Sequence, residues 1–237
     1  MSTEPEAEGD FISAHERVAS ALREEMLDGG LPPGTILREN GLAEKYRVSR
    51  NTLREAFHQL AYEGLVTTRL YKGTTVRTVN TEDIPDLYIV RRTFELRAIT
   101  EWPKRRDVHA SLDAAVRAAE ASAAAKRWRE VGTASLRFHQ HLVALLGSPT
   151  IDEIFRNILA RLRLAFTTAA DEAGFQEPWI ERDRAILEAL RAGRIADAED
   201  ELARYLDDSE AAVLRQVRAY HAGMNAVLAT PVAGGGH

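Results

Sequence analysis

Two arginines four residues apart, Arg50 and Arg54, are well suited to contact a polyanion. On a helix this spacing places both side chains on one side, and each planar guanidinium fits guanine O6 and N7 or a phosphate group. Asn51 lies beside them and can pair with adenine by the same two-point geometry. The alternative is that the arginines pair with Glu55 and decorate a solvated helix face, which is common for an isolated amphipathic helix.

A second set of polar residues lies on otherwise apolar helical stripes in the second half of the chain. Burying an ionised group without a partner is costly, so these side chains must meet one another, water, a metal or a ligand. Taken singly, each is more often a satisfied core residue than a ligand-binding one. Taken together, they predict a cavity between helices. The set consists of Arg91, Glu95, Ser135, His139, Asp183 and Tyr205.

The residues around Arg50 predict a helix-turn-helix followed by a β-hairpin. Val48 and Ser49 are a hydrophobic residue and an N-cap that open a helix, and Leu53 heads an apolar stripe along it. The β-branched runs that follow Gly64 predict two paired strands, which would form a wing behind the helices. The expected elements are an amphipathic helix from Phe11 to the Gly29-Gly30 stop, helices at 39–46 and 50–63, and strands at 65–69 and 74–77.

Beyond residue 81 the strand pattern is replaced by alanine-rich helical periodicity, which predicts an all-α bundle. The fold class expected for the whole chain is therefore mostly α. The helices are expected at 82–100, 108–125, 129–146, 150–173, 179–192 and 195–220. The expected organisation is a disordered tail at 1–10, a winged helix-turn-helix DNA-binding domain at 11–79, a linker at 80–86, a helical domain at 87–222, and a flexible tail at 223–237.

Composition narrows the possible classes further. The chain has 237 residues, of which 45% are hydrophobic and 28% charged, so it can form two modest cores and is not disordered throughout. It has no cysteine, which excludes disulfides, thiolate metal sites and a thiol nucleophile. No basic leader or run of about 20 apolar residues is present, so we expect a cytoplasmic protein. The net charge is −5, yet residues 36–79 carry eight Lys and Arg against four Glu, which favours a polyanionic partner for this segment.

The N-terminal third resembles the winged helix-turn-helix of the GntR family of transcription regulators. The resemblance rests on the runs Gly30 to Glu39, Val48 to Ala56 and Glu63 to Val66, and on Lys72-Gly73. It implies that the recognition helix, which begins after Ser49, contacts operator DNA through Arg50 and Arg54. It also implies that Arg38 contributes, that Lys72-Gly73 at the wing tip enters the minor groove, and that Asn51 and Thr52 tune operator choice.

The helical half resembles the FCD effector domain (the FadR C-terminal domain) of one GntR subfamily, through Val90-Arg91 with Glu95, Phe138-His139, Gly147 and residues 186–193. Many relatives bind a divalent metal there through one aspartate and three histidines. Here those positions are Ser135, His139, Asp183 and Tyr205, a poor donor set, so we expect no cofactor and an absent or weak metal. Arg91 and His139 would instead engage an acidic effector, with Asp183 and Tyr205 orienting it.

These features predict a homodimeric, ligand-responsive repressor that binds double-stranded DNA at a near-palindromic operator. The small-molecule effector is expected to be a carboxylate. Two alternatives stay open at this point. One is an enzyme that uses the cavity of His139 and Asp183, although the chain has no spacing of a nucleophile elbow, phosphate loop or helical metalloprotease. The other is a constitutive DNA-binding protein whose pocket is vestigial.

Overall fold

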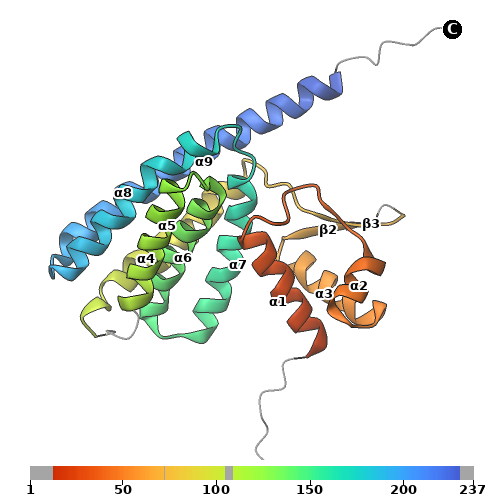
Figure 1. Ribbon diagram of the computed structural model, residues 1–237, viewed down its shortest axis with the longest axis horizontal. Coiled ribbons are helices and arrows are strands. Elements are labelled where there is room, and N and C mark those ends of the chain that lie inside the picture. Colours follow the sequence, from red (N-terminus) through yellow and green to blue (C-terminus); the bar gives the residue numbers. More distant parts are fainter. Residues whose placement is uncertain (1–12, 72, 105–108, 230–237) are drawn as a thin grey trace, which may run out of the picture.

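A computed structural model describes residues 13–71, 73–104 and 109–229 of the chain. A small N-terminal domain lies against a larger helical bundle (Figure 1). The predicted fold class is confirmed, with a winged helix-turn-helix followed by a bundle. The N-terminal elements are α1 (Ala14–Leu27), β1 (Ile36–Leu37), α2 (Glu39–Tyr46), α3 (Arg50–Tyr62), β2 (Val66–Arg69) and β3 (Gly73–Val76).

The wing is a three-stranded antiparallel sheet in the order β1-β3-β2. The predicted hairpin is confirmed, and Val66 pairs with Val76 at its base. The sequence did not predict β1, which has two residues and pairs Ile36 with Thr75. A two-residue strand is too short to show the alternation by which a longer strand is recognised.

The bundle contains helices only among the residues described, as predicted. Its helix α9, blue in Figure 1, runs along the bundle and continues past its end. The elements are α4 (Asp83–Ile99), η1 (Trp102–Lys104), α5 (His109–Ala124), α6 (Trp128–Val143), η3 (Ala144–Leu146), α7 (Pro149–Phe166), α8 (Glu172–Arg191) and α9 (Ile195–Ala229). Within the described part of the chain, none of these helices combines the length and the apolar character that crossing a bilayer demands.

One predicted boundary in the bundle is wrong. The expected break at Pro178 does not occur, because α8 begins at Glu172 and passes through that proline. The side chain of Asp171 caps the helix by accepting from the Gly174 backbone N–H at 3.0 Å. Proline leaves a single carbonyl of the preceding turn without its helical donor, and this part of α8 is solvent-exposed, so water can satisfy it.

Two other helix ends differ from the expected ranges. Helix α7 ends at Phe166 and does not continue to 173, whereas α9 continues to Ala229 and not only to 220. The flexible tail expected from 223 therefore starts within α9, and residues 1–12 and 230–237 lie outside the described part of the chain. Similarly, α4 starts at Asp83, inside the segment expected to act as a linker.

The cores of the two domains form one continuous apolar cluster, which extends from α1 and α3 into the bundle helices. Helix α1 packs on α3 within its own domain and also on α7 of the bundle. The N-terminal domain is therefore docked against the bundle, and it is not held by its connecting segment alone.

Candidate nucleic-acid interface and buried polar cluster

The start of α3 is fixed by its cap and by its buried face. Ser49 Oγ accepts from the Thr52 backbone N–H at 3.0 Å, which ends the preceding turn and sets the direction of the helix. The opposite face carries the predicted apolar stripe, which is buried against the rest of the domain: Leu53, Ala56, Phe57 and Leu60. The first turn of α3 is thereby held rigidly, with Arg50 and Asn51 exposed on its outer side.

Four of the polar side chains expected to face a partner are exposed, and they differ in what they contact, whereas Thr52 is half-buried with its hydroxyl 2.8 Å from that of Ser49. Arg50 and Arg38 are exposed and form no hydrogen bond or ion pair with any residue that the structure describes. Asn51 donates to Glu55 at 2.9 Å. Arg54 donates from Nε to both carboxylate oxygens of Glu39, at 3.2 and 3.1 Å, while its side chain stays 61% exposed. The predicted alternative, pairing of both arginines with Glu55, is therefore not what the structure shows.

The contact with Glu39 leaves the Arg54 side chain exposed to solvent. Glu39 lies on α2, so the ion pair links the two helices of the helix-turn-helix and holds the guanidinium beside the start of α3. Hydrogen bonding to Glu39 raises the pKa of Arg54 above its ordinary value, so this side chain stays cationic. An exposed ion pair contributes at most about 1 kcal/mol, which a phosphate or a base edge can replace.

The wing carries the remaining predicted residues of this interface. Gly73 is exposed with φ +78, a left-handed conformation that favours glycine. Lys72, which precedes it, lies outside the described residues. Arg69, at the end of β2, is exposed and contributes a cation that the sequence-based prediction had not assigned to the interface.

The six polar residues predicted to face the bundle interior come together there. All six are buried, and they come from four helices: α4, α6, α8 and α9. Arg91 Nε donates to Glu95 Oε1 at 2.7 Å, and His139 Nδ1 lies 2.6 Å from Glu95 Oε2. His139 Nε2 lies 3.5 Å from Asp183 Oδ1. The result is a chain of polar contacts that runs across the bundle from α4 through α6 to α8.

Two tyrosines complete this cluster. The Tyr205 hydroxyl lies 3.3 Å from Ser135 Oγ, and the Tyr205 ring centroid lies 4.8 Å from that of His139. The Arg91 guanidinium stacks over the ring of Tyr88 at 4.9 Å. The cation is thus held between a carboxylate and an aromatic face, as expected for a buried arginine.

The electrostatics of the cluster follow from its burial. Burial alone would raise the pKa of Glu95, but Arg91 and His139 hold that pKa below its ordinary value, so Glu95 is ionised. An ionised carboxylate only accepts, which assigns the proton of the His139 ring to Nδ1. Burial raises the pKa of Asp183 to about 6, against the smaller opposing effects of His139, Ser135 and Arg91. Asp183 therefore changes its charge near neutral pH.

Several polar atoms of this cluster have no hydrogen-bond partner among the residues that the structure describes. They are Arg91 Nη2, His139 Nε2, Asp183 Oδ1 and Asp183 Oδ2. Buried polar atoms are nearly always satisfied, so unsatisfied donors and acceptors gathered on three side chains indicate a site that a ligand or water completes.

The donor set does not fit a divalent metal. His139 offers one free nitrogen, because Nδ1 is engaged by Glu95, and Ser135 and Tyr205 lie within hydrogen-bond distance of each other. Among the described residues, no group of three or more His, Asp or Glu side chains has the geometry to hold a metal ion. Three protein ligands of this kind are the usual minimum for a first-row site.

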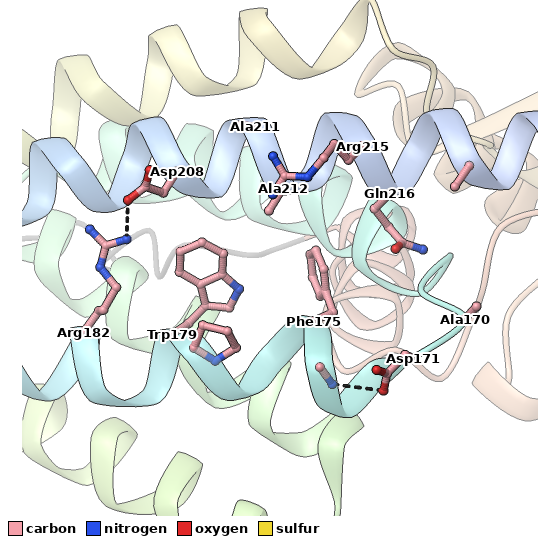
Figure 2. Close-up of a pocket in the computed structure, with 13 residues that line it drawn as sticks. Ala170, Asp171, Phe175, Trp179, Arg182, Asp208, Ala211, Ala212, Arg215 and Gln216 are labelled. Carbon is pink, nitrogen blue, oxygen red and sulfur yellow. Dashed lines mark hydrogen bonds and ion pairs between the residues drawn. The ribbon is translucent and has the colours of Figure 1, made fainter.

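An open groove lies next to the cluster, between α8 and α9 (Figure 2). Its volume is about 800 Å³, and Phe175 and Trp179 form its aromatic wall. Trp179 also packs on Tyr205, with ring centroids 5.0 Å apart, so this side chain contacts both the groove and the buried cluster. Arg182 closes one end through its 2.8 Å hydrogen bond to Asp208, drawn as a dashed line in Figure 2. Sequence reasoning missed these residues, because it treated Pro178 as a break between helices.

The contact between the two domains centres on a buried arginine of α7. Arg163 donates from Nε to the Leu27 carbonyl at 3.2 Å and from Nη2 to the Arg129 carbonyl at 2.9 Å. Burial lowers the pKa of Arg163 to about 10. Gly29, which follows the end of α1, lies close to the Arg163 guanidinium, since a Cβ at Gly29 would be 2.6 Å from Arg163 Nη2. The sequence held a signal for this role, a cation between Leu162 and Leu164.

Helix α6 contacts both the polar cluster and the N-terminal domain. Ser135 and His139 lie on its interior side, whereas Thr133 and Arg137 reach α1. Thr133 Oγ1 donates to the Leu27 carbonyl at 3.4 Å, and Arg137 forms an ion pair with Glu24. A change at the cluster can therefore reach α1, and through it α3, by direct packing.

The comparisons with known proteins agree with this architecture. Residues 14–76 match the family described as "Bacterial regulatory proteins, gntR family", and residues 86–208 match the FCD domain. The chain belongs to the GntR family. This GntR-family chain, with an FCD domain, is a DNA-binding transcription regulator, and the predicted resemblance is confirmed.

Individual relatives extend over both domains. In sequence, the chain is 35% identical to a GntR-type transcriptional regulator from Rhodococcus sp. RHA1, whose crystal structure is known. The two structures have a TM-score of 0.74, and the match covers 84% of this chain and 97% of that one. It is 27% identical to the probable D-xylose utilization operon transcriptional repressor of Paenarthrobacter nicotinovorans, over 80% of this chain and 85% of that protein. It is 24% identical to the galactonate operon transcriptional repressor of Escherichia coli K12, over 76% and 88% respectively.

Proposed function

We propose that this GntR-family regulator is a homodimeric repressor of a near-palindromic operator, and that a small acidic metabolite bound in the helical domain controls its binding to DNA. The observation that carries the proposal is the pairing of two features in one chain. An exposed cationic helix start lies in the N-terminal domain, and a buried polar cluster with unsatisfied atoms lies in the bundle. The names of the relatives, which are operon repressors, support the direction of regulation.

The proposed DNA contacts are made by the start of α3 and by the residues around it. Arg50 and Arg54 would contact base edges or phosphates in the major groove, and Asn51 and Thr52 would adjust the preferred sequence. Arg38 would contact the flanking backbone, Gly73 on the wing would enter the minor groove, and Ser49 would hold the helix start in register. Twofold symmetry of the dimer would place a second α3 on the other half of the operator.

The proposed effector site is the buried cluster. Arg91 Nη2 is the group that can donate to an anionic oxygen, and Asp183 in its protonated form can donate to the same ligand. His139 Nε2, with the ring proton on Nδ1, can accept from a hydroxyl of that ligand. Tyr205, Ser135 and Glu95 would fix the orientation of these groups. Because Trp179 contacts both the cluster and the open groove, we infer that the effector enters between α8 and α9 as this side chain moves.

The effector must favour one placement of the N-terminal domains over another, or it could not alter DNA binding. Helix α6, which contacts the cluster and α1, supplies one coupling path. The segment at 80–86 supplies a second, since Arg77 donates to Asp83 at 2.7 Å and thereby ties the wing to α4.

The test uses the full chain and short duplexes. Duplexes selected from a random pool with the wild-type protein serve as the operator probe, and fluorescence anisotropy measures their affinity. A panel of sugar acids and hydroxy acids is then screened by thermal shift, since a ligand of the folded state raises the melting midpoint. A hit should change the anisotropy titration, and its thermal shift should shrink in Ser135→Ala and Tyr205→Phe, which remove only hydroxyls. A panel in which no acid shifts the midpoint or the DNA affinity would contradict the effector site while leaving DNA binding intact.

A further inference from the structure

The tip of the wing presents two neighbouring large apolar side chains to solvent. Leu70 is 82% exposed and Tyr71 is 97% exposed, and neither packs on the apolar core. Tyr71 also has φ +63, a left-handed conformation that residues with a Cβ rarely adopt. Two exposed apolar side chains at one protruding point, one of them on strained backbone, mark a functional surface.

The strands behind the tip are firmly held. Val66 and Val76 are buried at the base of the hairpin, and the side-chain hydroxyls of Thr68 and Thr74 lie 3.0 Å apart across it. The register continues to the pair Arg69 and Gly73, directly behind the tip. The exposed side chains therefore follow directly on paired strands that are anchored in the core at their base.

The charge around the tip identifies the kind of partner. A polar hollow of about 410 Å³ lies beside the hairpin and is lined by Arg69, Arg77 and the hydroxyls of Thr67 and Thr75. Arg69 is exposed and has no partner among the described residues. A cation and hydroxyls beside an apolar tip complement a phosphate backbone that runs next to stacked bases, whereas an apolar protein groove would leave this cation unpaired.

We propose that Leu70 and Tyr71 form a wedge that enters the minor groove of DNA, inserts at a base step and bends the duplex, while Arg69 binds the adjacent phosphate. This inference rests on the DNA-binding function and adds a specificity mechanism to it. Pyrimidine–purine steps such as TpA unstack most easily, so the wedge selects operators that carry such a step under the wing, in addition to the bases that α3 reads.

The experiment uses the wild-type full chain and a duplex recovered with it from a random pool. The duplex carries a donor and an acceptor dye at its ends, and 2-aminopurine is placed in turn at each step flanking the α3 footprint. Wild-type protein should shorten the end-to-end distance and raise the 2-aminopurine fluorescence at one step. The double variant Leu70→Ser with Tyr71→Asn should lose both signals and bind about tenfold more weakly. Asparagine tolerates the left-handed conformation, and both positions are exposed, so folding is preserved.

Two further variants separate insertion from a general effect of surface change. Tyr71→Phe keeps the apolar ring and should keep the bend and the fluorescence signal. Tyr62→Ser removes a tyrosine that is 95% exposed at the end of α3, away from the tip, and should change nothing. Normal bending by the double variant, or a straight duplex with wild-type protein bound, overturns the wedge and leaves DNA binding standing. Failure of the wild-type protein to recover any duplex overturns both, and binding of the tip to anionic vesicles without DNA bending assigns it to a membrane.

Discussion

Replacing Asp183 by asparagine should change how the stability of the bundle depends on pH. Asp183 is buried on α8, its carboxylate oxygens have no hydrogen-bond partner in the described part of the chain, and its Oδ1 lies 3.5 Å from His139 Nε2. Arg91, Glu95 and the hydroxyls of Ser135 and Tyr205 are the other charged or polar groups of the same cluster. Asparagine has nearly the same shape and does not ionise, so the substitution removes the titration and leaves the packing largely intact.

The sign and size of this pH dependence follow from the pKa of Asp183, which burial raises to about 6 from 3.8. Between these values the folded protein holds a proton that the unfolded chain has already released. Wild-type stability therefore falls as pH rises from about 4 through 6, relative to a protein without this group. The separation of the two pKa values corresponds to on the order of 3 kcal/mol, at about 1.4 kcal/mol for each pKa unit.

The assay is urea unfolding followed by circular dichroism at pH 4.5, 5.5, 6.5 and 7.5 and constant ionic strength. The free energy of unfolding of Asp183→Asn minus that of the wild type should rise across this range by roughly 2 kcal/mol. Asp200→Asn, at an exposed position on α9, should run parallel to the wild type. Parallel profiles for Asp183→Asn and the wild type would refute the reasoning, because Asp183 would then titrate alike in the folded and unfolded states.

Three other outcomes can be measured directly. Arg54→Ala should cost roughly 1–3 kcal/mol of discrimination between the selected duplex and a scrambled one in anisotropy titrations. The control Glu39→Gln, which frees Arg54 from its ion pair, should retain this discrimination. Full discrimination by Arg54→Ala would show that this side chain reads no base. Gly29→Ala should lower the melting midpoint more than Gly34→Ala, because both positions have positive φ but only the Cβ at 29 meets Arg163, and equal losses would mean that Arg163 yields without cost. Elemental analysis of protein purified without a polyhistidine tag should find zinc and nickel well below one per chain, and a stoichiometric metal lost on His139→Ala would contradict the poor donor set.

The sequence predicted well those features that depend on local pattern. The cap at Ser49, the buried stripe of α3 and the exposed arginines follow from spacing along one helix, and the structure confirms them. The six interior polar residues were found for the same reason, since each stands out against an apolar stripe on its own helix. Periodicity places these side chains inside the bundle, but it does not show whether they bind an effector.

Features that depend on distant partners were missed. Strand β1 exists because β3 offers it an edge, and the α8 helix continues through Pro178 because Asp171 caps it early and water covers the affected turn. The contact of Arg163 with the Leu27 carbonyl joins residues 136 positions apart. Periodicity on α7 could flag that arginine as unusual, but it could not say that its partner would be the end of α1.

The contact between the two domains at Arg163 limits which N-terminal domains can be combined with this bundle. In a chimaera, the N-terminal domain of another relative is joined to this helical bundle. That domain must offer a backbone carbonyl to Arg163 Nε and a glycine beside Arg163 Nη2. A mismatched N-terminal domain would leave the Arg163 guanidinium unpaired between the two domains and weaken their contact. Grafts cut after α1, which retain residues 14–30 of this chain, should therefore keep the two domains docked better than grafts cut at the segment before α4.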